Sequence, residues 1–307
     1  MTLTELKYIV AVAREKHFGR AAEACFVSQP TLSVAIKKLE EELDVKLFER
    51  GASEVSVTPL GDEIVRQAQQ VIEQAQAIKE IAKRGKDPVS GPLRLGIIYT
   101  IGPYLLPDLV RQAIELVPQM PLMLQENFTA KLLDMLRTGD LDCAIMAEPF
   151  PDTGLAIAQL YDEPFMAAVP KNHPLAKRKS ISAEELKAET MLLLGTGHCF
   201  RDHVLEVCPE YARFSSDAEG IRKSFEGSSL ETIKYMVASG MGVTVVPLLS
   251  VPKEPQPHIQ YVKFSGSVPT RRVVLAWRRT FTRYEAIAAL RNVIYACPLT
   301  GMKRLTG

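Results

Sequence analysis

The hydrophobic pattern of the sequence changes at residues 85–92, and this change constrains the fold more than any other feature. Before this segment, apolar residues recur every three or four positions, as in amphipathic helices. After it, short apolar runs such as LRLGIIY (93–99) and DCAIM (142–146) alternate with helical patterns. Strands that alternate with helices form parallel sheets, so we expect an all-α region followed by a doubly wound α/β domain. The glycines and prolines of GKDPVSGP mark the segment itself as a linker.

Residues 1–58 are expected to form three helices followed by a short β-hairpin. The third helix is marked by an apolar stripe with helical spacing, which consists of Leu32, Ile36, Leu39 and Leu43. Ser28 is suited to cap this helix, and Pro30 is tolerated in its first turn. The segments KLFER and VSVT flank the turn-prone GASE, as the two strands of a wing would. This order of elements predicts a winged helix-turn-helix domain.

Residues 59–87 are expected to form one long helix. Its apolar positions alternate steps of four and three, which is a heptad seam, and they are Ile64, Ala68, Val71, Ala75, Ile78 and Ala82. These small side chains bury too little surface to stabilise a lone helix, so we expect the seam to bind a second copy of the chain. The alternative is a helix that packs on its own domain.

The start of the third helix is the expected DNA-reading surface, because a helix-turn-helix places this end in the major groove. Gln29 can pair bidentately with adenine, and hydroxyl side chains can bond several base edges. The predicted DNA contacts are Arg20, Ser28, Gln29, Pro30, Thr31, Ser33, Lys37 and Arg50. A dimer of such heads would bind an interrupted palindrome in double-stranded DNA. The alternative is a three-helix packing module that binds no DNA.

The motif GTGHCFRD (195–202) places Cys199 after a predicted strand and near the start of a predicted helix. The helix N-terminus, His198 and Arg201 are expected to favour the reactive thiolate. Cys208 lies nine residues further on, about 13 Å along a helix, whereas bridged cysteines have Cα atoms within about 7 Å. A disulfide between them would therefore have to unwind the helix. The alternatives are a buried structural cysteine and a zinc site, for which the CxxC-type spacing is absent, so no metal or cofactor is expected.

Two threonines are expected to lie near Cys199. Thr100 and Thr129 each follow a predicted strand, and ligands of open α/β sheets bind outside the carboxyl ends of strands. Ser228 and Ser229 precede a later helix in the same way. The simpler interpretation of each of these hydroxyls is a helix N-cap.

The overall charge and the cysteine content limit the cellular setting. The formal charge is +1, from 37 basic and 36 acidic residues, so any DNA contact must be made by a local surface. No apolar run is long enough for a transmembrane helix, and the N-terminus lacks a signal-peptide pattern. Five cysteines, an odd number spread along the chain, fit a reducing compartment. A cytoplasmic protein without membrane contact is expected.

Several stretches resemble LysR-type transcriptional regulators. They are AAEACFVSQPTLSVAIKKLEEEL with the following LFER and TPLG. Others resemble the peroxide-sensing members of that family: IYTIGPYLLP, LRTGDLDCAIMA, YDEPF, GHCFRD with Cys208, and SSLETIKYMVASGMGVTVVP. The wing sequence at 51–54 lacks the basic residues of many relatives, and the segment 209–223 is longer and more charged than expected.

This resemblance implies a tetrameric DNA-binding regulator of oxidative-stress genes, with RNA polymerase as a further partner. The effector domain would be residues 91–300, a two-lobed periplasmic-binding-protein-like α/β fold with parallel sheets. Lobe I would comprise about 91–161 and 268–300, and lobe II about 162–267. Hydrogen peroxide would oxidise Cys199 to a sulfenic acid, and Cys208 would resolve it as a disulfide. The implied peroxide pocket consists of Thr100, Thr129, His198, Arg201, Asp202 and Arg271, with Arg272 as the alternative arginine.

Three classes of function compete: a redox-sensing transcription factor, a LysR-type regulator that binds a metabolite, and a thiol peroxidase. The DNA-reading module argues against the enzyme, because turnover needs no DNA contact. Cys208 argues against the metabolite sensor, whose cleft has no use for a second thiol. The redox-sensing regulator is the expected function.

Overall fold

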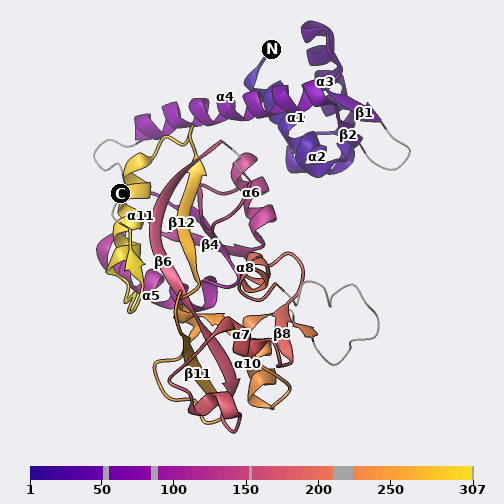
Figure 1. Cartoon of the computed structure of the whole chain (residues 1–307). Helices are drawn as coiled ribbons and strands as arrows, with labels where there is room; N and C mark the ends of the chain where they lie inside the picture. Colours follow the sequence, from indigo (N-terminus) through magenta and orange to yellow (C-terminus); the bar gives the residue numbers. More distant parts are fainter. Residues whose placement is uncertain (51–54, 84–88, 152–153, 210–223, 228, 306–307) are drawn as a thin grey trace.

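The computed structural model describes residues 1–50, 55–83, 89–151, 154–209, 224–227 and 229–305 of the 307-residue chain (Figure 1). Its N-terminal part has the predicted order: α1 (Leu3–Glu15), α2 (Phe18–Ala24), α3 (Gln29–Leu43), β1 (Phe48–Arg50) and β2 (Val55–Val57). The Ser28 hydroxyl accepts a hydrogen bond from the backbone N–H of Thr31 at 3.3 Å, which confirms the predicted cap of α3. Leu32, Ile36 and Leu39 are buried in the domain core. The wing turn at 51–54 lies outside the described residues.

The long helix is α4 (Pro59–Lys83), which leaves the N-terminal domain along the top of Figure 1. Its first turns pack on α1 and the neighbouring core through Ile64, Ala68 and Ile72. The later seam positions differ, since Val71 is 38% and Ile78 is 69% exposed. The beginning of the seam therefore packs on its own domain, and a more exposed apolar stretch follows, whose use as an interface with a second chain stays a prediction.

One nine-stranded sheet joins both lobes of the effector domain, in the order β4-β3-β5-β12-β6-β11-β7, with β10 and β13 also paired to β6. Its strands are β3 (Leu93–Ile98), β4 (Leu122–Asn127), β5 (Cys143–Ala147), β6 (Leu155–Pro170), β7 (Ser180–Ile181), β10 (Thr244–Pro247), β11 (Ile259–Phe264), β12 (Thr270–Arg278) and β13 (Lys303–Arg304). A separate parallel pair consists of β8 (Met191–Leu194) and β9 (Ser224–Gly227).

The expectation of parallel sheets is corrected by the register. Strands β3, β4 and β5 are parallel, but β12 runs antiparallel to both β5 and β6, and β10 and β11 run antiparallel to β6. The sequence predicted only the second half of β6, whereas the strand has 16 residues and runs through both lobes (Figure 1). Its first half mixes buried, half-buried and exposed positions, whereas its last four residues are all buried.

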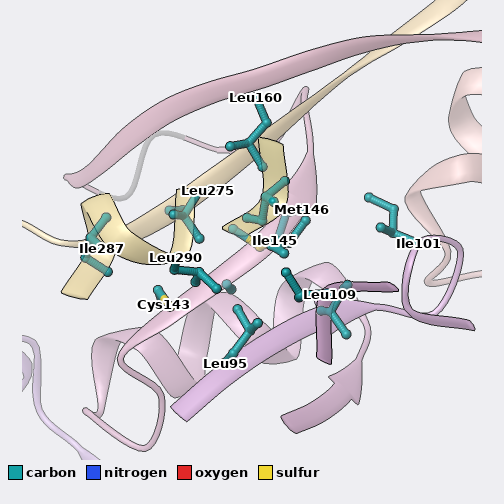
Figure 2. Packing of buried hydrophobic residues seen from close by; sticks show 14 of the residues in the cluster. Leu95, Ile101, Leu109, Cys143, Ile145, Met146, Leu160, Leu275, Ile287 and Leu290 are labelled. Carbon is teal, nitrogen blue, oxygen red and sulfur yellow. The ribbon is translucent and has the colours of Figure 1, made fainter. Parts of the chain in front are cut away.

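Two separate cores make two lobes, as expected. The first contains Leu95, Ile145, Leu275 and Leu290, which converge from strands and a helix in Figure 2. The second is built on β6, β8, β10 and β11. The helices of the effector domain are α5 (Gly102–Leu116), α6 (Thr129–Arg137), α7 (Ala183–Leu186), α8 (Cys199–Val207), α10 (Leu230–Ala238) and α11 (Tyr284–Ala296), with short 3₁₀ turns η1 (Pro174–Lys177) and η2 (Leu248–Ser250). Among the helices of the described residues, none has the length and apolar character needed to cross a membrane.

Candidate functional site

Cys199 is the first residue of α8, as predicted, and lies where the two lobes meet. It borders a cavity of about 10 Å³, roughly the space that a single water-sized oxygen requires. Thr100 at the end of β3 and Thr129 at the start of α6 border the same cavity. Gly197 completes the wall with a φ of +96°, and a Cβ there would lie 3.3 Å from the Phe128 ring. The predicted convergence of the two threonines with Cys199 is confirmed.

Arg271 lies behind this cavity and is almost completely buried. Its guanidinium donates to Thr100 Oγ1 at 2.8 Å and to the Thr100 carbonyl oxygen at 3.0 Å. Its charge is neutralised by Glu163, also buried, with Nε 2.8 Å from Oε2. The guanidinium carbon lies 5.2 Å from the centre of the Phe200 ring. Arg271 therefore fixes the position of the Thr100 hydroxyl.

The neighbouring Arg272 is half-buried and pairs instead with Asp162 at 2.8 Å. Of the two arginines considered from the sequence, Arg271 is the one that reaches the site. Glu163 was not anticipated, although it falls in the YDEPF stretch. It shares the inward face of β6 with Phe165, and a carboxylate at such a position is a signal of a buried ion pair.

The predicted ease of forming a Cys199 thiolate is not supported by this conformation. Burial raises the pKa of the Cys199 thiol above its ordinary value, and the Asp202 carboxylate raises it further. The Arg271 charge, the Thr129 hydroxyl and a backbone N–H act to lower the pKa but do not overcome burial. The Thr129 oxygen is itself buried without a fully formed hydrogen bond among the described residues, so it is available to an incoming polar atom.

The other predicted pocket residues divide into two groups. His198 precedes α8, borders the cavity and packs edge-on against Phe128, with ring centres 4.8 Å apart. Asp202 is exposed and influences Cys199 through its charge. Arg201 turns away, since its guanidinium donates to the Leu194 carbonyl oxygen at 3.0 Å, and it does not border the cavity.

Cys208 directly follows α8 as its C-cap residue and is fully buried in the core of lobe II. Both Cys199 and Cys208 are free thiols, and the segment between them is helical as predicted. A helical rise of about 13 Å separates them, so a disulfide requires α8 to unwind. Burial raises the pKa of Cys297 to about 11 and that of Cys143 further, which makes these two thiols poor nucleophiles.

A larger cavity of about 370 Å³ adjoins the small one and shares Thr100 and His198 with it. Tyr104 and Glu231 border it and join the lobes through a hydrogen bond of 2.6 Å. Glu126 also borders it, and burial raises the pKa of this carboxyl. In the parts of the chain that the structure describes, no group of three His, Cys, Asp or Glu side chains could hold a metal ion.

The predicted DNA-reading residues lie on the surface of the N-terminal domain. Those that are exposed are Arg20, Ser28, Gln29, Pro30, Thr31 and Lys37, whereas Ser33 is half-buried. Lys37 pairs with Glu41 at 3.6 Å, and the Arg20 guanidinium donates to the Glu15 carbonyl oxygen at 2.7 Å. The side chain of Arg50 lies outside the described residues. Sequence reasoning missed Val34, which is 67% exposed on α3 and is the kind of side chain that can contact a thymine methyl group.

Comparisons with known proteins give matches to the same kind of bacterial regulator along almost the whole chain. Residues 3–62 match the model of the bacterial regulatory helix-turn-helix protein, lysR family, and residues 86–296 match the LysR substrate binding domain. The hydrogen peroxide-inducible genes activator of Pectobacterium carotovorum is 39% identical over 94% of this chain and 95% of that protein. The DNA-binding transcriptional dual regulator OxyR of Escherichia coli K12 is 38% identical over 94% of each chain.

Comparison with solved structures also gives OxyR proteins as similar chains. A full-length variant of OxyR from Pseudomonas aeruginosa is 49% identical with a TM-score of 0.82, covering 100% of this chain and 98% of that one. A hydrogen peroxide-bound mutant of OxyR from Corynebacterium glutamicum is 33% identical with a TM-score of 0.64, covering 95% of this chain and 91% of that one. Because the matches extend over both the DNA-reading and the effector parts, the chain belongs to the LysR family of bacterial regulators, in its OxyR branch.

Proposed function

We propose that this protein is a transcriptional activator that senses hydrogen peroxide through Cys199 and controls oxidative-stress defence genes. One observation carries the proposal. Cys199 borders a cavity of about 10 Å³ between two threonines, and it begins a helix that ends at a second buried thiol, Cys208. A cavity of this size suits a very small oxidant. Once the oxidant has reacted with Cys199, a disulfide with Cys208 would change the structure of the helix between them. The OxyR relatives support the same function.

The chemistry proceeds in two steps. The Cys199 thiolate attacks one peroxide oxygen, so that an S–O bond forms, the O–O bond breaks and hydroxide leaves with a proton from the pocket. Thr100, held by Arg271, and Thr129 position the peroxide oxygens, while His198 and Asp202 handle protons.

The second step couples oxidation to folding. The Cys208 thiolate attacks the sulfenic sulfur, the S–S bond forms, the S–O bond breaks, and hydroxide leaves to become water. Because α8 separates the two sulfurs, it unwinds before this attack. The disulfide then stabilises a packing of lobe II that differs from that of the reduced protein.

We further propose a homotetramer built from two kinds of contact. The exposed stretch of the α4 seam, with Val71 and Ile78, would join two chains near their DNA-binding domains. A second apolar surface lies on α5 and the edge strand β4, where Ile114 is 68% and Met123 57% exposed. Apolar patches of this kind mark protein interfaces, so the effector domains would pair here.

The proposed domains are residues 1–58 for DNA binding, 59–87 for dimerisation and 91–300 for redox sensing. Residues 91–161 and 268–300 would form lobe I, and residues 162–267 lobe II. Paired reading heads would bind an interrupted palindrome, in the cytoplasm and together with RNA polymerase. Arg50 remains a predicted DNA contact, whereas Arg201, whose guanidinium binds the Leu194 carbonyl oxygen and does not border the small cavity, is left out of the proposed peroxide pocket.

A second candidate function rests on the larger cavity. Its volume of about 370 Å³ would admit a small metabolite, as expected for a ligand-sensing LysR-type regulator. Such a regulator would use neither thiol.

The test is a thiol count and a mass spectrum of the reduced protein before and after stoichiometric hydrogen peroxide. The wild-type chain should lose two thiols and gain a Cys199–Cys208 disulfide. Cys199→Ser should lose none, and Cys208→Ser should retain a sulfenic acid. Cys25→Ser serves as the control and should behave like wild type. Oxidation spread over all five cysteines, or no thiol loss, would defeat the proposal.

A further inference from the structure

The proposed mechanism does not use the buried imidazole of His203 on α8. His203 is 4% exposed and lies four residues after Cys199 and five before Cys208. Its Nε2 lies 2.7 Å from the carbonyl oxygen of Glu148, which can only accept, so Nε2 carries the proton. Nδ1 is buried and has no hydrogen-bond partner among the described residues.

This hydrogen bond crosses between the lobes. Glu148 follows β5 in lobe I, and its own backbone N–H donates to the Arg272 carbonyl oxygen of β12 at 2.9 Å. The acceptor is therefore held by the central sheet, whereas His203 belongs to lobe II. On the lobe II side, the imidazole ring packs against Phe165 and Phe200, with ring centres 6.1 and 6.3 Å away.

The packing around α8 is uneven along its length. Its last turn borders a cavity of about 340 Å³, lined by His203, Glu206 and Val207 from the helix. The anchored residue thus stands at the start of the part of the helix that borders this cavity. Besides the bond of Arg201 to Leu194 within lobe II, the bond of His203 to Glu148 ties α8 to lobe I, and unwinding toward Cys208 has to break it.

We propose that His203 is a positioning residue that restrains α8 against unwinding and thereby sets the rate at which Cys208 resolves the oxidised Cys199. The inference rests on the proposed peroxide function. Oxidation of Cys199 by peroxide requires no movement of His203. Disulfide formation requires the bond to Glu148 to break, because Cys199 and Cys208 lie on either side of it.

A pH dependence follows from the surroundings of His203. Burial lowers its pKa, and the Arg271 charge lowers it further, although the Glu148 carbonyl, Glu206 and Asp202 act in the opposite direction. The packed helix therefore favours the neutral imidazole over the protonated form. In water the pKa returns to about 6.5, so protonation below that pH favours the unwound helix.

The test separates the two steps in rapid-mixing experiments on the full-length reduced protein. The first phase depends on peroxide concentration and the second does not. His203→Leu should leave the first phase unchanged and accelerate the second by about 3- to 10-fold, the range expected for one lost hydrogen bond. His203→Gln, which retains an N–H donor, should resolve at the wild-type rate near neutral pH. His173→Gln, a histidine at η1 away from α8, is the matched control.

Two further measurements, the pH dependence of the second phase and hydrogen exchange along α8, test the same role of His203. Below about pH 6.5 the second phase of wild type should become faster than that of His203→Gln, since glutamine cannot take up a proton. Hydrogen exchange of the reduced protein should show faster exchange along α8 in His203→Leu, and this holds whether or not peroxide reacts. An unchanged or slower second phase in His203→Leu would overturn the proposal that His203 restrains α8. Identical pH profiles of the second phase for wild type and His203→Gln would overturn it as well. A wild-type protein without a peroxide-dependent phase would instead refute the proposed function.

Discussion

The buried Arg271 guanidinium depends on Glu163 for neutralisation, and the two side chains have no measurable exposure. Removing one partner of a buried ion pair leaves an uncompensated charge. Glu163→Gln should therefore lower the free energy of unfolding of the reduced protein by about 3–5 kcal/mol, measured by denaturant titration. Asp162→Asn is the control, since Asp162 pairs with the more exposed Arg272 and its loss should cost about 0–1 kcal/mol. Equal losses in both variants would contradict the assignment.

The ionisation of Cys199 gives a second prediction. Burial raises its pKa, so the thiolate is scarce at neutral pH and alkylation by iodoacetamide should accelerate about tenfold per pH unit from pH 7 upward. Thr129→Val removes a hydroxyl that lowers this pKa, so its profile should shift to higher pH. Thr129→Ser should restore the wild-type profile. A flat profile between pH 7 and 8.5, measured by mass spectrometry of Cys199, would show an already ionised thiol.

Helix α3 exposes the side chains with which we expect it to read DNA. Gln29→Ala should relax the preference for one base pair by about 1–3 kcal/mol. Lys37→Ala should weaken binding evenly across sequences and reduce the salt slope, because lysine neutralises a phosphate rather than reading a base. Operator and mismatched fragments should be titrated at fixed salt. Unchanged affinity in both variants would remove α3 from the interface.

For helix α4, the prediction concerns the exposed part of its seam as an interface between two chains. Val71 is 38% exposed in the single chain, so a glutamate there would be tolerated in an isolated chain but not in an apolar interface. Val71→Glu should therefore lower the mass in sedimentation by separating α4-paired chains. Gln76→Glu, an equally charged change at an exposed position off the seam, should keep the native mass. A native mass for Val71→Glu would exclude the seam as an interface.

At the scale of the whole molecule, Glu73 of α4 connects the linker helix to the effector domain. Its carboxylate lies 2.7 Å from Arg278 Nε and accepts from the Thr280 hydroxyl at 2.8 Å, both at the end of β12. Since this contact joins the linker helix to the sheet, a rearranged effector domain can move the DNA-reading heads through it. Glu73→Gln should bring the operator affinities of the reduced and oxidised forms several-fold closer together, within the 5- to 150-fold range of typical coupling.

A more exposed contact between the same parts provides the control. Arg14 of α1 and Asp140 of lobe I form an ion pair of 3.2 Å with side chains 40% and 34% exposed. Asp140→Asn should leave the ratio of affinities nearly unchanged, because exposed pairs contribute little. The coupling role of Glu73 fails if its variant also preserves the wild-type ratio.

Local sequence determined the features of this protein that depend on neighbours along the chain. The stripe of α3 and the Ser28 cap follow from helical periodicity and capping, which operate within a few residues. The start of α8 near Cys199 follows from the helical pattern after the apolar strand β8. The convergence of Thr100 and Thr129 was also predictable, because strand ends of a parallel sheet share one edge.

The tertiary structure decided what depends on distant partners. The full length of β6 is set by pairing with β12, and the burial of Glu163 becomes understandable only with Arg271, 108 residues later. Burial also reversed the expected ease of ionising Cys199, since desolvation depends on the surrounding lobes and not on its own helix. The bond from His203 to Glu148 likewise spans 55 residues, so no local pattern could indicate it. Charge burial and long-range pairing are properties of the packed molecule, which is why the sequence alone leaves them open.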